Sequence, residues 1–432
     1  MTLSIAFQNA IVYGVNLADN IMVGGYSQTT LSGVALVNQI QFLLQMIVMG
    51  AGEGIVVLGA RFWGQRDARQ VKRAVGAGML TGLAGAALLW AIVFFFPTQV
   101  LRLLTPELPV IEEGVRYMRI VCFTYLFFAV TNLLLAAFRS VESVRIGFYV
   151  SLSALVVNVS LNYVLIYGKL GFPALGGEGA AIATLISRVV EFVVVVIYLL
   201  KVDRKLHLRL RDLVTTDREM YAQYIRVSLP LILSQSMWGI AQTAQTAILG
   251  HIGDDAIAAN SIAATVFSIV TVVIYGGASA SAVVIGKTLG EGRRDLIREY
   301  VRTLQVIYLL LGVATGLGIF FFKDVVIGFY NITDTARRLS LEFMTVLSVT
   351  SVGTAYQMTC FTGIIRGGGD TKVTLINDLI HMWLIVIPSA ALSAFVFHFS
   401  PVVVFSCLKC DQILKCGLAA IWVNSDRWIK KI

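Results

Sequence analysis

Three carboxylates stand inside long apolar segments of this sequence. Asp19 lies near the end of the first segment, Glu53 lies among glycines in the second, and Asp378 stands beside Asn377 and His381 in the eleventh. Ionisable groups are costly inside a bilayer and mark ion or proton pathways. A buried carboxylate can take up a proton or bind a hard cation. We therefore predict that Asp19 binds a proton or a cation, and we keep Glu53 and Asp378 as competing candidates.

The segments that position these acids are long enough to cross a membrane. The 432 residues are 57% hydrophobic and only 14% charged, and the mean hydropathy is +0.80, which leaves too little polar surface for a soluble globule. A run of about 20 apolar residues matches a hydrocarbon core about 30 Å thick, and these runs lack the alternation of barrel strands. The sequence predicts an all-α integral membrane protein with about twelve spans, near residues 2–23, 30–59, 74–97, 113–138, 146–168, 176–200, 224–249, 257–286, 302–322, 339–364, 374–397 and 401–422.

The chain repeats itself weakly with an offset of about 226 residues. Arg61-Phe-Trp-Gly64 aligns with Lys287-Thr-Leu-Gly290, and further on Phe138-Arg139-Ser140 aligns with Ile365-Arg366-Gly367. Because each half carries six spans, both halves begin on the same face, and a pseudo-two-fold axis runs along the membrane normal. The predicted parts are a first lobe in residues 1–200, a charged linker in residues 201–223 and a second lobe in residues 224–432.

The net charge of +9 follows alternate loops and does not indicate a nucleic-acid partner. The richer set of loops carries basic residues from Arg61 to Arg73 and from Lys201 to Arg226, and we count Lys409 and Lys415 with the same side. By the positive-inside rule, this side and both termini are cytoplasmic.

The five cysteines do not form a disulfide framework, since Cys122 and Cys360 lie inside spans. The spacing of Cys407, Cys410 and Cys416 leaves two interpretations, a metal site or small apolar filler in a helix. We predict filler and no structural metal, because zinc motifs normally pair two such knuckles on soluble loops.

Five stretches of the chain resemble a known family, the multidrug and toxic compound extrusion (MATE) transporters. They follow the family order over nearly the whole chain and read Ala18-Asp-Asn-Ile-Met-Val-Gly24, Arg61-Phe-Trp-Gly-Gln-Arg-Asp67, Leu161-Asn-Tyr-Val-Leu-Ile-Tyr-Gly168, Gly176-Gly-Glu-Gly-Ala-Ala-Ile-Ala-Thr-Leu-Ile-Ser-Arg188 and Arg366-Gly-Gly-Gly-Asp-Thr-Lys372. The resemblance implies two six-helix lobes around a cleft. It also implies export of organic, often cationic or aromatic, compounds in exchange for H⁺ or Na⁺.

The resemblance also implies a cation-coupling cluster in the first lobe. In one branch of the family, an aspartate in the first helix works with an Asn-x-x-x-Asp in the fifth and a threonine in the sixth. Asp19, Asn158 and Thr184 match these positions, while Asn162 replaces the second aspartate. Asn132 resembles another position of the family cluster.

The chemistry of these residues suits ion binding. Asn158 and Asn162 are four residues apart and share one helix face. Asn162, Thr184 and Asp19 each lie within about two turns of the same end of their helices, so they could meet at one depth. Their oxygens could bind a hard cation or hydrogen-bond a carboxyl group. Ordinary interhelical polar contact is the alternative interpretation.

Other positions give further expectations. Arg188 and Glu191 are three residues apart, so we predict that they neutralise each other. The second lobe lacks the family's usual acids, because residues 234–238 and 353–357 contain no carboxylate. A mixed aromatic, methionine and amide surface suits flat organic cations. The predicted substrate-cleft residues are Gln39, Gln45, Trp238, Gln242, Tyr275, Tyr356 and Met358.

These observations predict a secondary active multidrug exporter that works by rocker-switch alternating access. We expect a transporter and not an enzyme, with H⁺ or Na⁺ as the coupling ion and no other cofactor. We also expect it to act as a monomer in a bacterial inner membrane. A lipid-linked precursor flippase of the same superfamily is one alternative, although the predicted cleft contains few basic residues. A membrane-embedded transferase is a second alternative, but the four histidines are scattered.

Overall fold

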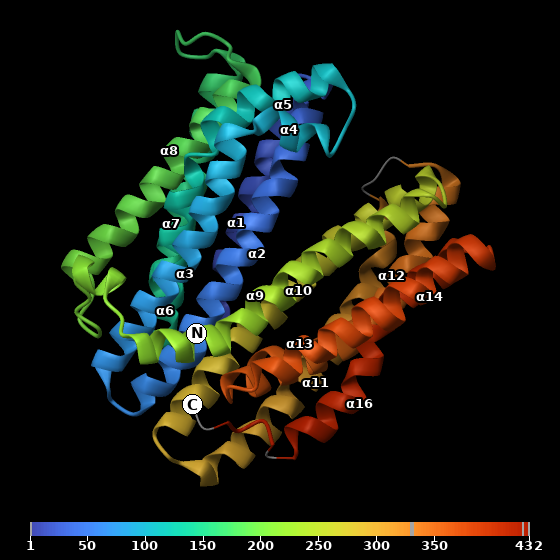
Figure 1. Ribbon diagram of the computed structural model, residues 1–432. Helices are drawn as coiled ribbons and strands as arrows, with labels where there is room; N and C mark the ends of the chain where they lie inside the picture. The colour runs from blue at the N-terminus through green and yellow to red at the C-terminus, as the bar shows by residue number, and fades with distance from the viewer. Residues whose placement is uncertain (1, 329–331, 426, 431–432) are drawn as a thin grey trace. The chain divides into compact units, whose positions relative to one another are not determined.

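The computed structural model describes residues 2–328, 332–425 and 427–430 (Figure 1). The described residues are helical apart from turns, loops and one isolated bridge between Gly369 and Ile429. The chain divides into two compact units, one holding residues 3–63 and 67–232 and the other holding mainly residues 233–432. The predicted all-α membrane fold is confirmed.

The first unit contains six spans, followed by a linker. Its elements are α1 (Thr2–Gly24), α2 (Gln28–Gly64), α3 (Ala68–Phe95), α4 (Pro97–Arg102), α5 (Leu108–Val121), α6 (Thr124–Ser140), α7 (Arg145–Tyr167), α8 (Gly176–Ile197), the π-helical η1 (Tyr198–Val202), the 3₁₀ turn η2 (Leu210–Val214) and the start of α9 (Arg218–Gly250). The span expected at residues 113–138 is broken, since α5 and α6 meet at an angle of 53°.

The second unit contains the rest of α9 and five further spans. Its elements are α10 (Asp254–Gly290), α11 (Arg294–Gly328), α12 (Asp334–Met358) with η3 (Thr359–Ile365), α13 (Thr371–Leu379) with η4 (Ile380–Val386), α14 (Ile387–Ala391) and η5 (Leu392–Val396), and finally α15 (Pro401–Lys409) and α16 (Asp411–Val423). The elements η3, η4 and η5 are π-helical. The last span, expected to be continuous, is interrupted at Cys410.

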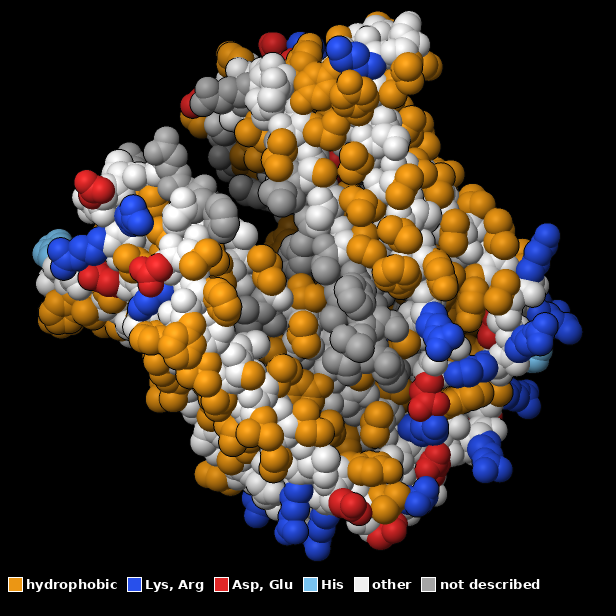
Figure 2. Space-filling model, turned by 180° about the vertical axis from the view of Figure 1, so that it is seen from behind, with side chains coloured by type: hydrophobic (Ala, Val, Ile, Leu, Met, Phe, Trp, Pro, Cys, Tyr) orange, Lys and Arg blue, Asp and Glu red, His pale blue; other side chains and the backbone are white. Residues whose placement is uncertain are grey.

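Length and composition support the membrane assignment. Among the described residues, seven helices are long and apolar enough to cross a bilayer, or eight when α5 and α6 count as one span. Figure 2 shows apolar side chains over much of one face, with Lys and Arg gathered near the edges of the view.

Local sequence signals explain where several helices begin and end. The Asp67 carboxylate accepts hydrogen bonds from the backbone N–H groups of Arg69 and Gln70 and so caps the start of α3. Thr333 caps α12 through the N–H of Ala336. Gly168, with φ of 65°, ends α7 in the left-handed region that favours glycine.

Glycines let helices of the first unit approach closely. A Cβ atom on Gly50 would lie 2.5 Å from the Ile232 Cα, and one on Gly54 would lie 2.6 Å from the Ser228 Cβ. The expectation that small residues around Glu53 permit close packing is therefore confirmed. A Cβ on Gly179 of α8 would lie 2.6 Å from the Leu165 carbonyl oxygen of α7.

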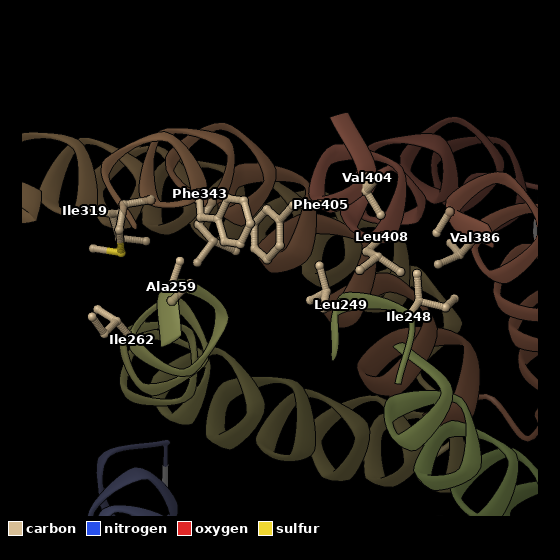
Figure 3. Close-up of a cluster of buried hydrophobic side chains, with 14 of the residues drawn as sticks. Ile248, Leu249, Ala259, Ile262, Ile319, Phe343, Val386, Val404, Phe405 and Leu408 are labelled. Carbon is tan, nitrogen blue, oxygen red and sulfur yellow. The ribbon is translucent and has the colours of Figure 1, made fainter. Parts of the chain in front are cut away.

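The second unit has a large buried apolar cluster (Figure 3). The rings of Phe343 in α12 and Phe405 in α15 stack with centroids 4.0 Å apart at its centre. Ile248, Ala259 and Val386 bring α9, α10 and η4 into the same cluster. Cys407 and Cys410 pack against it, as the filler interpretation expects.

A glycine motif follows η3, where the helix ends. Trp428 is 1% exposed and lies against Gly368, where an added Cβ would come within 2.1 Å of the indole ring. The Lys430 N–H donates to the Gly368 carbonyl at 3.1 Å, and the Lys430 ammonium lies 3.3 Å from Asp370. The end of the chain is therefore packed onto the junction between η3 and α13.

The interpretation of Lys409 and Lys415 as members of a basic surface side is wrong. Both residues lie in helices of the second unit, α15 and α16. The Lys409 ammonium lies 5.3 Å from the Phe267 ring centre, and Lys415 is 5% exposed. Lys415 is therefore buried within the last span and Lys409 is half-buried there, whereas the loop count attributed both to a basic loop.

The linker packs on the first unit through ion pairs. Lys72 lies 3.1 Å from Asp212, and Arg73 contacts Asp217 at 2.5 Å. Partial burial works to raise the pKa of the Asp212 carboxyl, but the backbone N–H of Arg209 and the Lys72 ammonium outweigh burial and hold the pKa below its usual value.

The close approach of α7 and α8 predicts a clear mutational effect. Gly179→Ala should destabilise the protein by about 1–3 kcal/mol, because the new methyl group overpacks the helix contact. Gly318→Ala in α11 is the matched control, since nothing lies within 4 Å of an added Cβ there. Thermal unfolding in detergent measures both variants. An equally stable Gly179→Ala variant would contradict the packing described.

The lowered pKa of Asp212 predicts acid sensitivity of the linker. A carboxyl group with a depressed pKa in the folded state stabilises that state above its unfolded pKa, near 3.9, and loses this effect as pH falls through the folded value. The melting temperature of wild type should therefore exceed that of Asp212→Asn at neutral pH. The difference should shrink as pH falls below about 4. A constant difference across this range would argue against the ion pair.

Candidate functional site

Polar side chains from three spans of the first unit meet around Asp19. Asp19 comes from α1, Asn158 and Asn162 come from α7, and Thr184 comes from α8. Asn158 and Asn162 are completely buried, Thr184 is 7% exposed, and Asp19 is partly buried.

The carboxylate of Asp19 is held by an amide. The Asn162 Nδ2 donates to the Asp19 Oδ1, and the same nitrogen donates to the Asn158 Oδ1 at 3.1 Å. The two asparagines lie four residues apart on α7, so the helix itself sets this arrangement. The expectation that Asp19 and Asn162 lie at one depth is confirmed.

Tyr117 of α5 joins this group, although the sequence did not suggest it. Its side chain is 4% exposed, and its hydroxyl group lies within electrostatic range of Asp19 and beside Thr184. A single tyrosine in an amphipathic helix gives no sequence signal for a site. Only the fold places it there.

The sixth span also contains the expected internal ion pair. The Arg188 Nη1 lies 2.8 Å from the Glu191 Oε2, and both side chains are largely buried. The Arg188 guanidinium stands 5.1 Å from the Phe128 ring centre. It also acts electrostatically on Asp19. The predicted mutual neutralisation is confirmed, and the pair supplies positive charge near the cluster.

The cluster has oxygen atoms suited to a small cation. Asn162 Oδ1 is buried and has no hydrogen-bond partner among the described residues. Together with the Asp19 carboxylate, the Asn158 Oδ1 and the Thr184 hydroxyl, it offers the ligand types that hard cations prefer. A proton on Asp19 would instead let the carboxyl group donate a hydrogen bond within the cluster.

Asn132 has a different contact. Its Nδ2 donates to the Phe128 carbonyl at 2.9 Å within α6. This hydrogen bond is local to one helix and does not join Asn132 to the Asp19 cluster.

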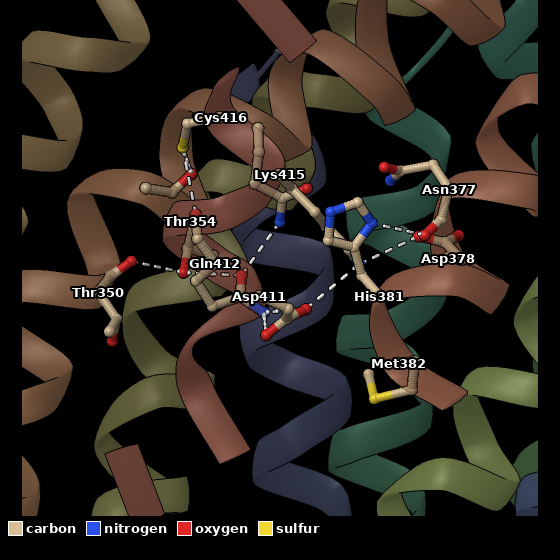
Figure 4. Close-up of polar contacts among 12 residues, drawn as sticks. Thr350, Thr354, Asn377, Asp378, His381, Met382, Asp411, Gln412, Lys415 and Cys416 are labelled. Carbon is tan, nitrogen blue, oxygen red and sulfur yellow. Dashed lines mark hydrogen bonds and ion pairs between the residues drawn. The ribbon is translucent and has the colours of Figure 1, made fainter. Parts of the chain in front are cut away.

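The other two acids have basic partners. Glu53 is 2% exposed and lies 3.8 Å from the Arg139 Nη2. Asp378 of α13 accepts a hydrogen bond from the Ser234 hydroxyl of α9 at 2.5 Å and lies 3.2 Å from the Lys415 ammonium of α16 (Figure 4). Both acids thus balance a cation within their own unit.

The predicted cleft residues divide by their contacts. Trp238 is 41% exposed and lines a small pocket beside Asp378, and the Tyr275 hydroxyl accepts from Gln235 at 3.2 Å. The Tyr356 hydroxyl donates to Gln305 at 2.7 Å, and its ring packs against a buried cluster inside the second unit. Tyr356 is therefore packed within the second unit, and its substrate role stays a prediction.

Four further cleft predictions have only their exposure described. Gln39 is exposed, while Gln45, Gln242 and Met358 are half-buried. Their substrate role stays a prediction.

Comparison with known proteins agrees with this arrangement. The MatE family model matches residues 4–164 and 230–392. A Thermotoga maritima protein named probable multidrug resistance protein NorM is 24% identical over 98% of this chain and 91% of its own length. Both matches run through each of the two units.

Solved structures show the same fold. A MATE crystal structure in complex with MaL6 superimposes with a TM-score of 0.89 at 21% identity, covering 98% of this chain and 94% of the other. A MOP superfamily transporter from Pyrococcus furiosus gives 0.88 at 21% identity over 100% and 96% of the two chains. The two-lobed helical fold with polar groups buried in its spans is that of a membrane transporter. The chain belongs to the MatE family of MATE transporters.

The Arg188–Glu191 pair predicts a large effect on stability. Arg188→Gln should leave Glu191 buried without a countercharge and cost about 3–5 kcal/mol. Arg338→Gln is the control, because Arg338 pairs with Glu342 at the surface and exposed pairs contribute at most about 1 kcal/mol. Thermal unfolding should rank the two variants in that order. Equal losses would mean that the Arg188 pair is not desolvated.

Proposed function

We propose that the protein is a secondary active multidrug exporter, which exchanges organic compounds for H⁺ or Na⁺ by rocker-switch alternating access. It acts as a transporter and not as an enzyme. Membership of the MatE family and the name of the Thermotoga maritima relative support export of drugs as the activity. Organic, often cationic or aromatic, compounds are the proposed substrates.

One observation carries the choice of Asp19 as the coupling residue. Among the described residues, Glu53, Glu191 and Asp378 each lie within 4 Å of a basic side chain, but Asp19 has only neutral amides as hydrogen-bond partners. A carboxylate without a fixed countercharge is the one that gains most from a mobile cation. Asp19 is therefore the acid best suited to bind and release the coupling ion.

The cluster around Asp19 would convert ion binding into a conformational preference. Loading Asp19 with a proton or Na⁺ changes which hydrogen bonds Asn162 and Asn158 can make, and so favours one packing of α1 against α7. If that packing binds the substrate less well, ion entry releases the substrate. Thr184 and Tyr117 extend the same network to α8 and α5.

The proposed setting follows the charge distribution. The protein is placed in a bacterial inner membrane with both termini in the cytoplasm, because the basic loops lie on that side. It works as a monomer, since each chain holds a complete cluster. The substrate and the lipid bilayer are its proposed partners.

The experiment uses ethidium efflux from proteoliposomes under separately imposed proton and sodium gradients. Asp19→Asn should reduce gradient-driven efflux about 5- to 150-fold, the range of a typical coupling free energy, because the neutral amide cannot take up a proton and lacks the negative charge that attracts Na⁺. The gradient that drives wild type identifies the ion.

The matched control is Asp324→Asn, which removes an exposed acid of α11 and should transport like wild type. Full export by Asp19→Asn would refute coupling through Asp19. Wild type that moves no organic cation under either gradient, but moves a polyprenyl-diphosphate lipid, would favour the flippase instead.

A further inference from the structure

Lys415 is an ammonium group held between two carboxylates in the second unit (Figure 4). Its Nζ lies 3.2 Å from the Asp378 Oδ1 of α13 and 3.2 Å from the Asp411 Oδ2 one turn earlier in α16. The Lys415 side chain is 7% exposed and that of Asp411 is 1% exposed. The ammonium thus occupies the position that a free small cation would take between two carboxylate ligands. Unlike a free ion, it is attached to the chain.

Neutral side chains fix both carboxylates in place. The Gln412 amide nitrogen donates to the two oxygens of Asp411 at 2.9 and 3.0 Å. The Gln412 oxygen in turn accepts from Thr354 at 3.1 Å and from Gln357 at 3.0 Å, both in the span that begins with α12. The site is therefore held from α12 as well as from α13 and α16.

The charges around Asp378 are few. From α16 it faces Lys415 and, beyond it, Asp411. From α9 the uncharged Ser234 hydroxyl donates a hydrogen bond to Asp378. On its own helix, His381 is buried and a ring nitrogen contacts the Asn377 carbonyl at 2.9 Å. Two acids thus share one ammonium.

A small pocket reaches this site. Its volume is about 20 Å³, and Ser234, Trp238, Asp378, Trp383 and Lys415 are among its lining residues. A cavity of this size holds about one water molecule. It admits an ion such as ammonium or sodium but not an aromatic drug.

We propose that Asp378 and Asp411 form a binding site for a small monovalent cation, and that the Lys415 ammonium is the tethered cation that fills it. Asp411 is 1% exposed and the Asp378 side chain is 31% exposed, so without the ammonium between them the two carboxylates repel each other and Asp411 lacks a countercharge. Removing the ammonium should therefore create a vacant site that takes up an ion from solution. Asp411 stands four residues before Lys415, so the helix already presents half of the site.

The consequence for transport rests on the proposed function. If the second lobe carries its own cation, it exchanges no ion with solution during the transport cycle. Ion exchange is then confined to the Asp19 cluster of the first lobe. Lys415 is then a specificity-determining residue, because it excludes a second coupling ion.

Chemical rescue tests the proposal on the full-length protein in detergent. Melting temperatures are measured by tryptophan fluorescence at neutral pH and constant chloride, with ammonium, sodium or choline as cation. Lys415→Ala should be more than about 2 °C more stable in ammonium or sodium than in choline, because the methyl groups of choline keep its charge from direct contact with the carboxylate oxygens. Wild type and Lys323→Ala, which removes an ammonium bound to the Thr345 hydroxyl, should show no cation preference.

A second variant keeps the test decisive if Lys415→Ala does not fold. Asp378→Asn and Asp411→Asn combined with Lys415→Ala remove both carboxylates together with the ammonium, so no charge is left unpaired. This triple variant should fold and show no cation preference. A folded Lys415→Ala insensitive to the cation, or a triple variant no better folded than the single one, would overturn the proposal.

These melting temperatures require no transport activity, so they test the tethered-cation site independently of the proposed export function. Rescue without ethidium efflux would leave the site standing and remove the proposed function. Ethidium efflux by wild type without cation rescue of Lys415→Ala would support the proposed function and overturn the cation site.

Discussion

A charge inside a membrane span must find its countercharge within the protein, and this constraint organises both units. The hydrocarbon core contains no water to solvate an ion, so burying an unpaired charge there costs a free energy of several kcal/mol or more. Glu53 meets Arg139, Glu191 meets Arg188, and Lys415 meets two aspartates. Each pair also joins or stiffens particular helices, so electrostatic balance and helix packing are fixed together.

Asp19 stands apart from this pattern. Its neighbours are amides and hydroxyl groups, which can accept or donate hydrogen bonds in either charge state of the carboxyl group. The positive charge nearest to it, on Arg188, is already engaged by Glu191. The first unit thus keeps one acid whose balance comes from outside the protein, which is what a coupling site needs. In the second unit, the positive charge that balances Asp378 and Asp411 is the Lys415 ammonium of the chain itself.

Some of this arrangement follows directly from the sequence, and some does not. Apolar runs predict spans because bilayer thickness sets their length. Arg188 and Glu191 could be paired from a spacing of three residues, and Asn158 with Asn162 from a spacing of four. Asp378 and Lys415 lie 37 residues apart on different helices, so no local spacing reveals their contact. The same limit hid Tyr117, which only tertiary packing brings to Asp19.

The π-helical segments set a second limit. Their wider turns break the 3.6-residue period on which face assignments depend. The segments η3 and η4 interrupt the spans that contain Tyr356 and Asp378, so helix faces cannot be followed through these spans from the sequence alone. Loop counting failed for Lys415 because this basic residue lies in the last span but was attributed to the surface.

The packing of Trp428 against Gly368 has a consequence for biosynthesis. The junction between η3 and α13 gains its indole cover and its bridge from Gly369 to Ile429 only after 60 further residues have been made. At about 5–20 residues per second, this takes roughly 3–12 s. During that interval the glycine turn lacks the indole ring that packs on it in the folded structure. The second lobe therefore completes its fold only after its last span has entered the membrane, whereas every partner of Asp19 has been synthesised by the middle of the chain.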